Sequence, residues 1–419
     1  GRDSACRAGR PAMLATASNQ PPLTLDRRYM GVVLAMLMTG LVMVYSANLP
    51  LPSSNAETIV WAQLKGHPLH VVLGLLAFAL AFRISSDDLH RYSGLLFTFG
   101  LLLLLVVLGF KFIGGESFVR DGAVRSIPVG PLTFQPSELM KLLAIIFAAA
   151  YAVRRHDRMR EDLIKGLAPI GLLMVIVISL LMAQPDLGTT VVITVTVAAV
   201  LLLGGMSLRV VIPLVILLVA FFALAIYLTP FRVARIMSYL TPCEAGHAQA
   251  AGYQLCGALI AFGHGGLFGS GLGTGVAKLG YLPLPHTDFI FAVIGEELGF
   301  VGVTALLLGF AYLIRYCIQV GRLAMSQERL FAGLVAQGIG VWIGVQTFIH
   351  SGVNTGLLPT KGLTLPLISY GGSSMLVVCF ALGVVARIDA ENRAMARGRR
   401  IGPLGPSGAA AKAARDKAS

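Results

Sequence analysis

Ten long apolar segments constrain this chain more than any other feature of its sequence. Each approaches the roughly 20 apolar residues that a helix needs to cross a hydrocarbon core. They lie near residues 30–47, 67–82, 94–110, 138–153, 167–183, 188–204, 209–228, 290–314, 332–353 and 366–388. With 56% hydrophobic and only 13% charged residues, the chain lacks the polar surface of a soluble domain. The sequence therefore predicts an all-α polytopic membrane protein of about ten transmembrane helices.

The distribution of lysine and arginine predicts the orientation of these helices. An even number of spans puts both termini on one side, and the loops on that side together with the termini hold 24 of the 33 Lys and Arg residues. Positive residues favour the cytoplasmic side. We therefore expect a cytoplasmic tail at 1–26, a membrane domain at 27–388 and a basic cytoplasmic tail at 389–419.

Nine basic residues remain at the outer side or at outer helix ends, against the usual trend. They are Lys65, Lys111, Arg120, Arg125, Lys141, Arg232, Arg235, Lys278 and Lys361. The basic tails themselves suit an anionic lipid surface. They are not interleaved with an aromatic reading surface, so nucleic acid is not an expected partner.

Two predicted outer loops, near 111–137 and 229–289, are long enough to carry function. The second joins the seventh and eighth helices. Its glycine-rich run at 261–275 is incompatible with a regular spanning helix and suits a backbone packed against protein. Cys243 and Cys256 both lie in this loop, where an oxidising compartment would permit a disulfide, although their spacing does not establish one.

Asp288 lies at the end of this loop, directly before a predicted helix. Thr287 or Asp288 could cap that helix by accepting hydrogen bonds from its free amides. Its surroundings also favour a functional role. At the outer end of the fourth helix, Glu138 and Lys141 lie three residues apart on one face, and charges at membrane depth usually pair or mark a substrate path.

Two further sets of residues belong to the candidate outer surface. Glu296 and Glu297 lie further along the eighth helix, and we favour a structural role for each as a buried partner of an arginine. The loop at 357–374 contains the cation Lys361. It also offers hydroxyls and accessible backbone amides suited to an anion such as diphosphate, at Ser369, Gly371 and Gly372.

Four segments in this order resemble motifs of the SEDS family (shape, elongation, division and sporulation). They are FQPSELMK at 134–141, QPDLGT at 184–189, HTDFIFAVIGEELGFVG at 286–302 and LPTKGLTLPLISYGGSS at 358–374. Lys361 makes the chain more similar to the division branch, the FtsW proteins, than to the RodA branch. The chain departs from the usual family pattern at Ser126, Thr241, Gly257 and Leu284.

The resemblance implies a peptidoglycan glycosyltransferase that polymerises lipid II into glycan strands for the division septum. It implies an inverting transfer with Asp288 as general base, and a diphosphate leaving group that needs cations nearby. We expect Lys141, Arg125 and Lys361 to hold diphosphate or glycan, Glu138 to orient Lys141, and Arg232 and Arg235 to lie at the cavity mouth. A divalent cation, Mg²⁺ or Mn²⁺, bound through Asp288 or the substrate phosphates, stays open.

The resemblance also implies partners. A class B penicillin-binding protein would crosslink the strands made here, and other membrane proteins of the division machinery would assemble with it. Two alternatives of other classes stay open at this point: a lipid II flippase, and a division scaffold without catalysis.

Overall fold

The structure, a computed structural model, describes residues 24–48, 56–113, 125–129, 132–156, 163–207, 252–280, 282–359 and 362–397, together with scattered positions between 209 and 243. Its longer helices are α1 (Arg27–Ala47), α2 (Ala56–Arg83), α3 (Ser86–Ile113), α4 (Pro136–Arg154), α6 (Leu163–Ala183), α7 (Leu187–Leu203), α11 (Ile290–Ser326), α12 (Leu330–Asn354) and α13 (Gly372–Ala396). The shorter elements are α10 (Tyr253–Gly265), β1 (Ile127–Val129) and β2 (Leu132–Phe134).

Eight of these helices are long and apolar enough to cross a membrane, and α7 is a shorter apolar helix in the same bundle. The prediction of a multi-pass α-helical membrane protein is confirmed. Most of the predicted span at 209–228 lies outside the described residues. The antiparallel pair β1–β2, with Ile127 opposite Phe134, is the one sheet in the described part of the chain.

Several helix boundaries differ from the apolar segments, because helices continue where polar side chains find partners. The last helix begins at Gly372 and not near 366, since Leu367 has a left-handed φ of 64° that interrupts any earlier helix. It also continues past the boundary expected at 388. Its last turns bury Asp389, Glu391 and Asn392, which an apolar pattern would place outside the membrane domain.

Glu391 accounts for much of this buried polar end. Its carboxylate contacts Arg387, at 2.7 Å, and Arg329, and it also accepts hydrogen bonds from Ser86. These contacts join α13, the start of α12 and the start of α3. Paired and hydrogen-bonded charges are the form in which ionised side chains tolerate burial.

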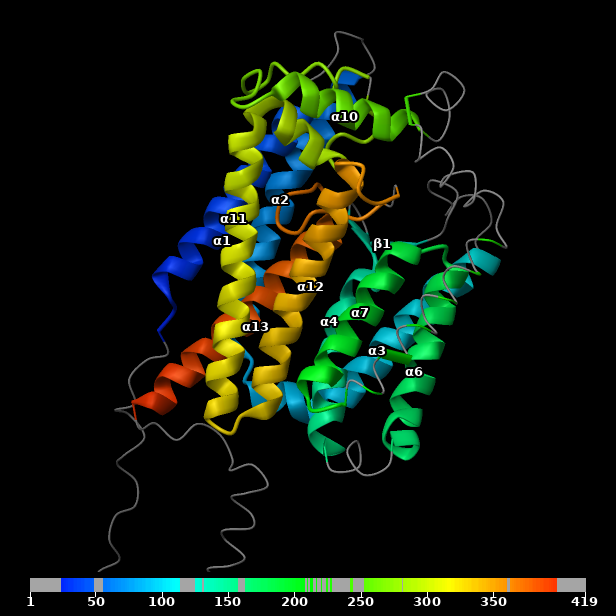
Figure 1. Ribbon diagram of the computed structural model, residues 1–419, viewed down its shortest axis with the longest axis vertical. Coiled ribbons are helices and arrows are strands. Elements are labelled where there is room, and N and C mark those ends of the chain that lie inside the picture. The colour runs from blue at the N-terminus through cyan, green and yellow to red at the C-terminus, as the bar shows by residue number, and fades with distance from the viewer. Residues whose placement is uncertain are drawn as a thin grey trace, which may run out of the picture.

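The centre of the bundle is formed by α4, α12 and α13, the spans with the largest buried shares. Around them, α11 packs on α12, α2 on α13, and α3 and α7 on α4 (Figure 1). The start of α1 and the end of α13 lie at one end of the bundle, and α10 lies across the other end. We call these the terminus end and the loop end.

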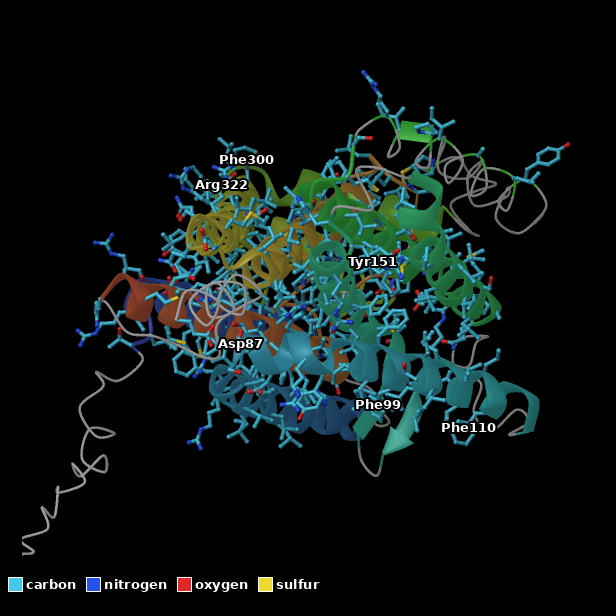
Figure 2. The ribbon with its side chains drawn as sticks, turned by 90° about the horizontal axis from the view of Figure 1, so that it is seen from below. Asp87, Phe99, Phe110, Tyr151, Phe300 and Arg322 are labelled. Carbon is cyan, nitrogen blue, oxygen red and sulfur yellow. A yellow bond between two sulfur atoms is a disulfide. The ribbon has the colours of Figure 1, made fainter. Side chains whose placement is uncertain are left out.

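The outer faces of the bundle carry large apolar side chains, as a lipid-facing surface does. Phe99 of α3 and Phe300 of α11 are more than half exposed and lie on opposite sides of the molecule when it is viewed along the bundle (Figure 2). The polar side chains of the core gather instead toward the two ends, and those at the loop end form the candidate site.

Candidate active site

Asp288 lies at the loop end, half-buried and one residue before the N-cap of α11. The prediction that Thr287 or Asp288 caps this helix is wrong, because the N-cap residue is Phe289 and no side-chain cap hydrogen bond is present. The side chain of Asn354, at the end of α12, caps the helix start instead. Its side chain accepts a hydrogen bond from the amide of Ala292, at 3.2 Å, and donates one to the carbonyl of Asp288, at 3.0 Å.

The loop before α13 packs against the segment that carries Asp288. Ser369 donates a hydrogen bond from its hydroxyl to the carbonyl of Thr287, at 2.8 Å, and accepts one from the amide of Leu365, at 2.7 Å. The amide of Tyr370 donates to the carbonyl of His286, at 2.9 Å. Two segments 82 residues apart in the chain are therefore held together directly before Asp288.

Gly362 brings this loop against the carboxylate itself. A side chain at that position would come within 3.0 Å of Asp288 Oδ2, so only glycine lets the backbone approach so closely. Lys361, its neighbour in sequence, lies outside the described residues. Ser369 is 3% exposed and its hydroxyl is used inside the protein, so it supports the Asp288 segment in this structure.

Glu138 and Lys141 form an ion pair near the start of α4, with 2.8 Å between Oε2 and Nζ. The lysine side chain is 1% exposed and the glutamate side chain 6%. The ammonium also donates to Gln346 Oε1, at 2.9 Å, and lies 5.3 Å from the centre of the Trp342 ring. Lys141 is therefore enclosed by protein and does not open to solvent in this structure.

Gln346 of α12 connects this ion pair to the loop before α13 through hydrogen bonds. Its amide nitrogen donates to the carbonyl of Thr364, at 2.8 Å, while the hydroxyls of Thr364 and Ser374 are 2.9 Å apart. A continuous line of hydrogen bonds thus runs from Lys141 through Gln346 and Thr364 to the first turn of α13. Neither Gln346 nor Asn354 stands out in the sequence, since the few polar residues of α12 are scattered along an apolar helix.

Arg125 precedes the β1–β2 hairpin and binds the turn between α6 and α7. Its guanidinium donates to the carbonyls of Gln184, at 3.3 Å, and Pro185, at 2.9 Å. In the next residue of that turn, Asp186 caps α7 through the amide of Thr189 and accepts a hydrogen bond from Ser137 at 2.9 Å. The guanidinium therefore fastens the hairpin to the start of α7, near the Glu138 helix.

Gly371 and Gly372 form the start of α13. Gly371 is the N-cap residue, with extended backbone and no side-chain cap hydrogen bond. A side chain at Gly372 would collide with His70 of α2, whose Nε2 would be 2.7 Å from its Cβ.

His67, His70 and His286 surround the Tyr370 ring, with ring centres 5.5 to 5.7 Å apart. His286 and Tyr370 lie outside the membrane spans. Burial lowers the pKa of His286 and raises the pKa of Tyr370.

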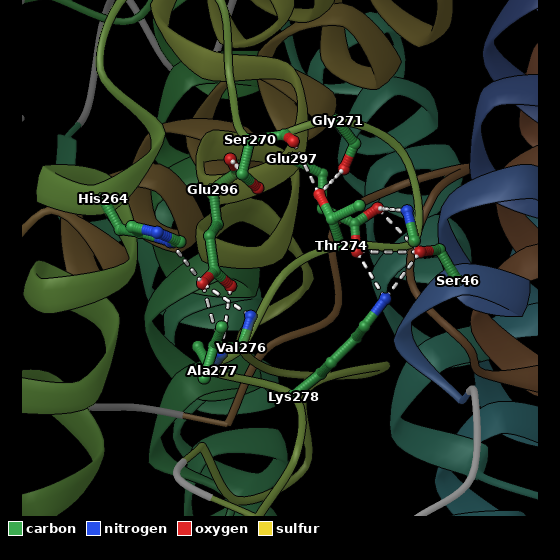
Figure 3. Close-up of polar contacts among 11 residues, drawn as sticks. Ser46, His264, Ser270, Gly271, Thr274, Val276, Ala277, Lys278, Glu296 and Glu297 are labelled. Carbon is green, nitrogen blue, oxygen red and sulfur yellow. Dashed lines mark hydrogen bonds and ion pairs between the residues drawn. The ribbon is translucent and has the colours of Figure 1, made fainter.

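Glu296 and Glu297 have the structural role that we favoured, although their partners are not arginines. Glu297 pairs with Lys278 at 2.6 Å and accepts hydrogen bonds from Ser46 of α1. Glu296 accepts hydrogen bonds from two backbone amides, of Val276 and Ala277, and lies 3.1 Å from His264 (Figure 3). Both carboxylates are about 1% exposed.

The glycine-rich run forms the end of α10 followed by a folded loop on α11. Residues 261–265 end the 13-residue helix α10, which is too short to cross a membrane, in keeping with the expectation that this run forms no regular spanning helix. Beyond Gly266 the loop pairs with a break in α11 at Gly299, where the amides of Phe300 and Val301 donate to the carbonyls of Gly266 and Leu267. The segment leading to Asp288 is thereby fixed to α11 at both ends.

Two pairs of predicted residues and the predicted metal site remain. Cys243 and Cys256 form a disulfide, with Cα atoms 5.2 Å apart. Arg232 and Arg235 lie outside the described residues. Within the part of the chain that the structure describes, no three His, Cys, Asp or Glu side chains are placed to hold a metal ion. Asp288 offers one carboxylate, so a bound divalent ion would take its other ligands from substrate phosphates and water.

Comparison with known proteins assigns the chain to a family. Residues 27–394 match the family model FTSW_RODA_SPOVE, described as "Cell cycle protein". The chain belongs to this family. The FtsW/RodA/SpoVE match covers every described helix and the loops that hold Asp288.

Relatives of the FtsW branch share nearly half of its residues. Proteins named probable peptidoglycan glycosyltransferase FtsW are 44% identical in Burkholderia thailandensis, over 90% of this chain and 81% of the relative, and 45% identical in Nitrosomonas europaea, over 91% and 97%. The family resemblance expected from the motifs is thus confirmed.

Solved structures give the same result. The rod shape determining protein RodA of Thermus thermophilus superposes with a TM-score of 0.62 at 30% identity, covering 88% of this chain and 98% of that one. A chain from a structure described as the coordination of polymerization and crosslinking by a peptidoglycan synthase complex gives 0.67 at 28% identity, covering 88% and 99%.

Proposed function

We propose that this chain is a peptidoglycan glycosyltransferase of the FtsW type, which polymerises lipid II into glycan strands at the division septum. What supports the proposal is the half-buried carboxylate of Asp288, held at the loop end by Asn354 and the loop before α13, in a chain of this family. We place the loop end on the outer side of the bacterial inner membrane and both termini in the cytoplasm, where basic residues are enriched.

In the proposed reaction, Asp288 is the general base. It removes the proton from the 4-hydroxyl of the acceptor sugar as that oxygen attacks C1 of the donor sugar. The bond between C1 and the lipid diphosphate breaks, and the diphosphate leaves with the electron pair. Attack from the face opposite the leaving group inverts the configuration at C1. A positioned base of this kind contributes about 10² to 10⁴-fold in rate.

Cations stabilise the charge that develops on the leaving diphosphate. Arg125 and Lys361 are our candidates for direct contact, with Arg232 and Arg235 at the cavity mouth. Lys141 acts indirectly. Its enclosed ammonium donates a hydrogen bond to Gln346, which in turn donates one to the loop before α13. Gly371 and Gly372 present backbone amides to the same group. A divalent ion bound by the substrate phosphates would add positive charge there.

The proposed partners follow from the product. New glycan strands must be crosslinked, so a class B penicillin-binding protein is the expected partner, together with other membrane proteins of the division machinery. The basic ends of the chain suit the anionic lipid of the inner leaflet.

The decisive experiment uses the full chain co-purified with its penicillin-binding partner and given lipid II. Glycan products are resolved on a gel for the wild type, Asp288→Asn and the matched control Asp88→Asn, which changes an exposed carboxylate at the terminus end. Polymer from the wild type and the control, with none from Asp288→Asn, is the expected result. Equal polymer from all three would refute the base assignment, and lipid II transport in vesicles without polymer would identify a flippase.

A further inference from the structure

The start of α13 has features that glycosyl transfer by Asp288 does not explain. Its N-cap residue, Gly371, makes no side-chain cap hydrogen bond. The hydroxyls that follow are used elsewhere: Ser373 bonds the backbone of Gln135 and Thr133, and Ser374 contacts Thr364. Amides at a helix N-terminus point outward and favour a negative charge, so an uncapped start is suited to an anion.

The imidazole of His70 is aimed at this helix start. Its Nε2 lies so close to Gly372 that a Cβ there would be 2.7 Å away, and the residue is 9% exposed. Among the described residues its Nδ1 has no hydrogen-bond partner. A buried polar atom left unpaired destabilises the folded protein, so its presence calls for an explanation.

His67 lies one turn before His70 and repeats the pattern more strongly. It is 2% exposed, and in the described part of the chain neither of its ring nitrogens has a hydrogen-bond partner. Both histidines contact the ring of Tyr370, which directly precedes Gly371. Two unsatisfied imidazoles therefore stand beside an uncapped helix start.

The ionisable groups around this pair determine how it responds to a ligand. His70 and His286 are the other described imidazoles beside His67, and all three rings contact Tyr370. The third neighbour is the Tyr370 ring. Because imidazolium groups repel one another, the site favours neutral rings when empty and protonation when an anion is bound. Among the described residues, no three His, Cys, Asp or Glu side chains are placed to hold a metal ion here without ligands from the substrate.

We propose that His70, backed by His67, and the start of α13 form a diphosphate-binding subsite in which His70 takes up a proton as the anion binds. The inference rests on the proposed function, because the anion is the lipid diphosphate that leaves the donor sugar. His70 donates a hydrogen bond to one phosphate oxygen, and the amides of α13 contact the same group. Asp288 and the start of α13 both contact the loop before α13, at Gly362 and Thr364 respectively, so base and leaving group are on different elements.

The test measures binding and does not depend on turnover. Inorganic diphosphate is titrated into the full chain with its partner, by calorimetry at pH 7 in two buffers of different ionisation enthalpy. The variants are His70→Gln, His70→Asn and the matched control His156→Gln, a histidine at the terminus end that contacts Gly204. We expect proton uptake on binding to the wild type and the control. Both His70 variants should lose the uptake and bind about tenfold more weakly.

The pH dependence supplies the second readout. Affinity of the wild type for diphosphate should fall by up to about tenfold per pH unit as the imidazole loses its proton, and the His70 variants should show a flatter profile. No proton uptake by the wild type, or the same pH profile in wild type and both variants, would overturn the proposal. The difference in proton count between the wild type and a His70 variant decides it, because inorganic diphosphate itself exchanges protons near pH 7, and either of the two variants suffices if the other does not fold.

Two further measurements complete the test. The first distinguishes recognition of the diphosphate from recognition of the lipid tail, and the second distinguishes failure of the subsite from failure of the proposed glycosyltransferase activity. Undecaprenyl diphosphate should compete with inorganic diphosphate, whereas undecaprenyl monophosphate should compete at least tenfold less well; equal competition would show recognition of the lipid tail and would refute the subsite. The lipid II gel assay runs on the same preparations. Wild-type polymer without proton-linked diphosphate binding rejects the subsite alone, and absence of polymer rejects the glycosyltransferase.

Discussion

The side-chain amide of Asn354 donates a hydrogen bond to the backbone carbonyl of Asp288, across 3.0 Å. The same amide group accepts a hydrogen bond from Ala292, so one side chain satisfies both the loop that carries Asp288 and the first turn of α11. Asn354 is fully buried. The direction of the Asp288 carboxylate is thus coupled to the end of α12, an element with no catalytic group of its own.

Asn354→Ala should lower kcat by at least tenfold with a smaller change in KM, because the base shifts while the binding surface remains. It should also cost about 1 to 3 kcal/mol of folding free energy, since buried backbone groups lose their partner. Thr355→Ala, at the exposed neighbouring position, is the control. Polymerisation kinetics and thermal melts check both effects, and equal kinetics in the two variants would contradict the positioning role.

Lys278 and Glu297 should behave as one buried unit. Lys278→Met or Glu297→Gln alone leaves an unpaired buried group and should cost about 3 to 5 kcal/mol. The double variant should be more stable than either single one, because no uncompensated charge remains. Thermal melts of the four proteins in detergent form a double-mutant cycle. Additive losses would show that the 2.6 Å pair is not an energetic unit.

Gly299→Ala should destabilise the loop end strongly. Gly299 has φ 65° and ψ −166°, a conformation open essentially to glycine alone, and an added Cβ would overlap the carbonyl oxygen of Leu267 at 2.6 Å. We expect a loss of at least about 2 kcal/mol. Gly94→Ala in α3 is the matched control, since nothing lies within 4 Å of its Cβ, and it should be neutral or stabilising. Similar melting temperatures would argue against the break in α11.

Gln346→Leu should impair catalysis through the loop before α13. It removes the relay from Lys141 to Thr364 and leaves the ammonium with Glu138 alone. We expect kcat to fall about tenfold or more, as for a small misplacement of catalytic groups. Gln337→Leu, nine residues earlier in α12 and toward the terminus end, serves for comparison. A larger loss in Gln337→Leu would contradict the relay.

Removal of the Cys243–Cys256 disulfide should lower the melting temperature. The bond closes a loop with a sequence separation of 13, for which chain entropy predicts about 3 kcal/mol. A reducing agent should therefore lower the melting temperature of the wild type and leave a Cys243→Ser/Cys256→Ser variant unchanged. An equal response to reductant in both proteins would mean that the pairing contributes nothing to stability.

The sequence was informative wherever a physical pattern repeats along the chain. Apolar length predicted the spans, because every backbone polar group in lipid must be satisfied within a helix. Ordered motifs predicted the family. Local rules failed at Asp288, where a cap was a reasonable expectation and the capping group, Asn354, lies 62 residues from the Ala292 amide whose hydrogen bond it accepts. They also failed at residue 388, because Arg329 and Ser86, which contact the buried Glu391, come from other helices.

The sequence by itself determined that this chain is a bundle of membrane helices of the FtsW/RodA/SpoVE family with an aspartate before its eighth predicted span. Tertiary structure alone decided which groups surround that aspartate. Asn354, Gln346 and His70 are polar residues scattered in apolar helices, and their positions follow no hydrophobic period that would single them out. Their partners are set by helix packing and by the folded loops, through contacts between residues distant in sequence, which no local pattern encodes.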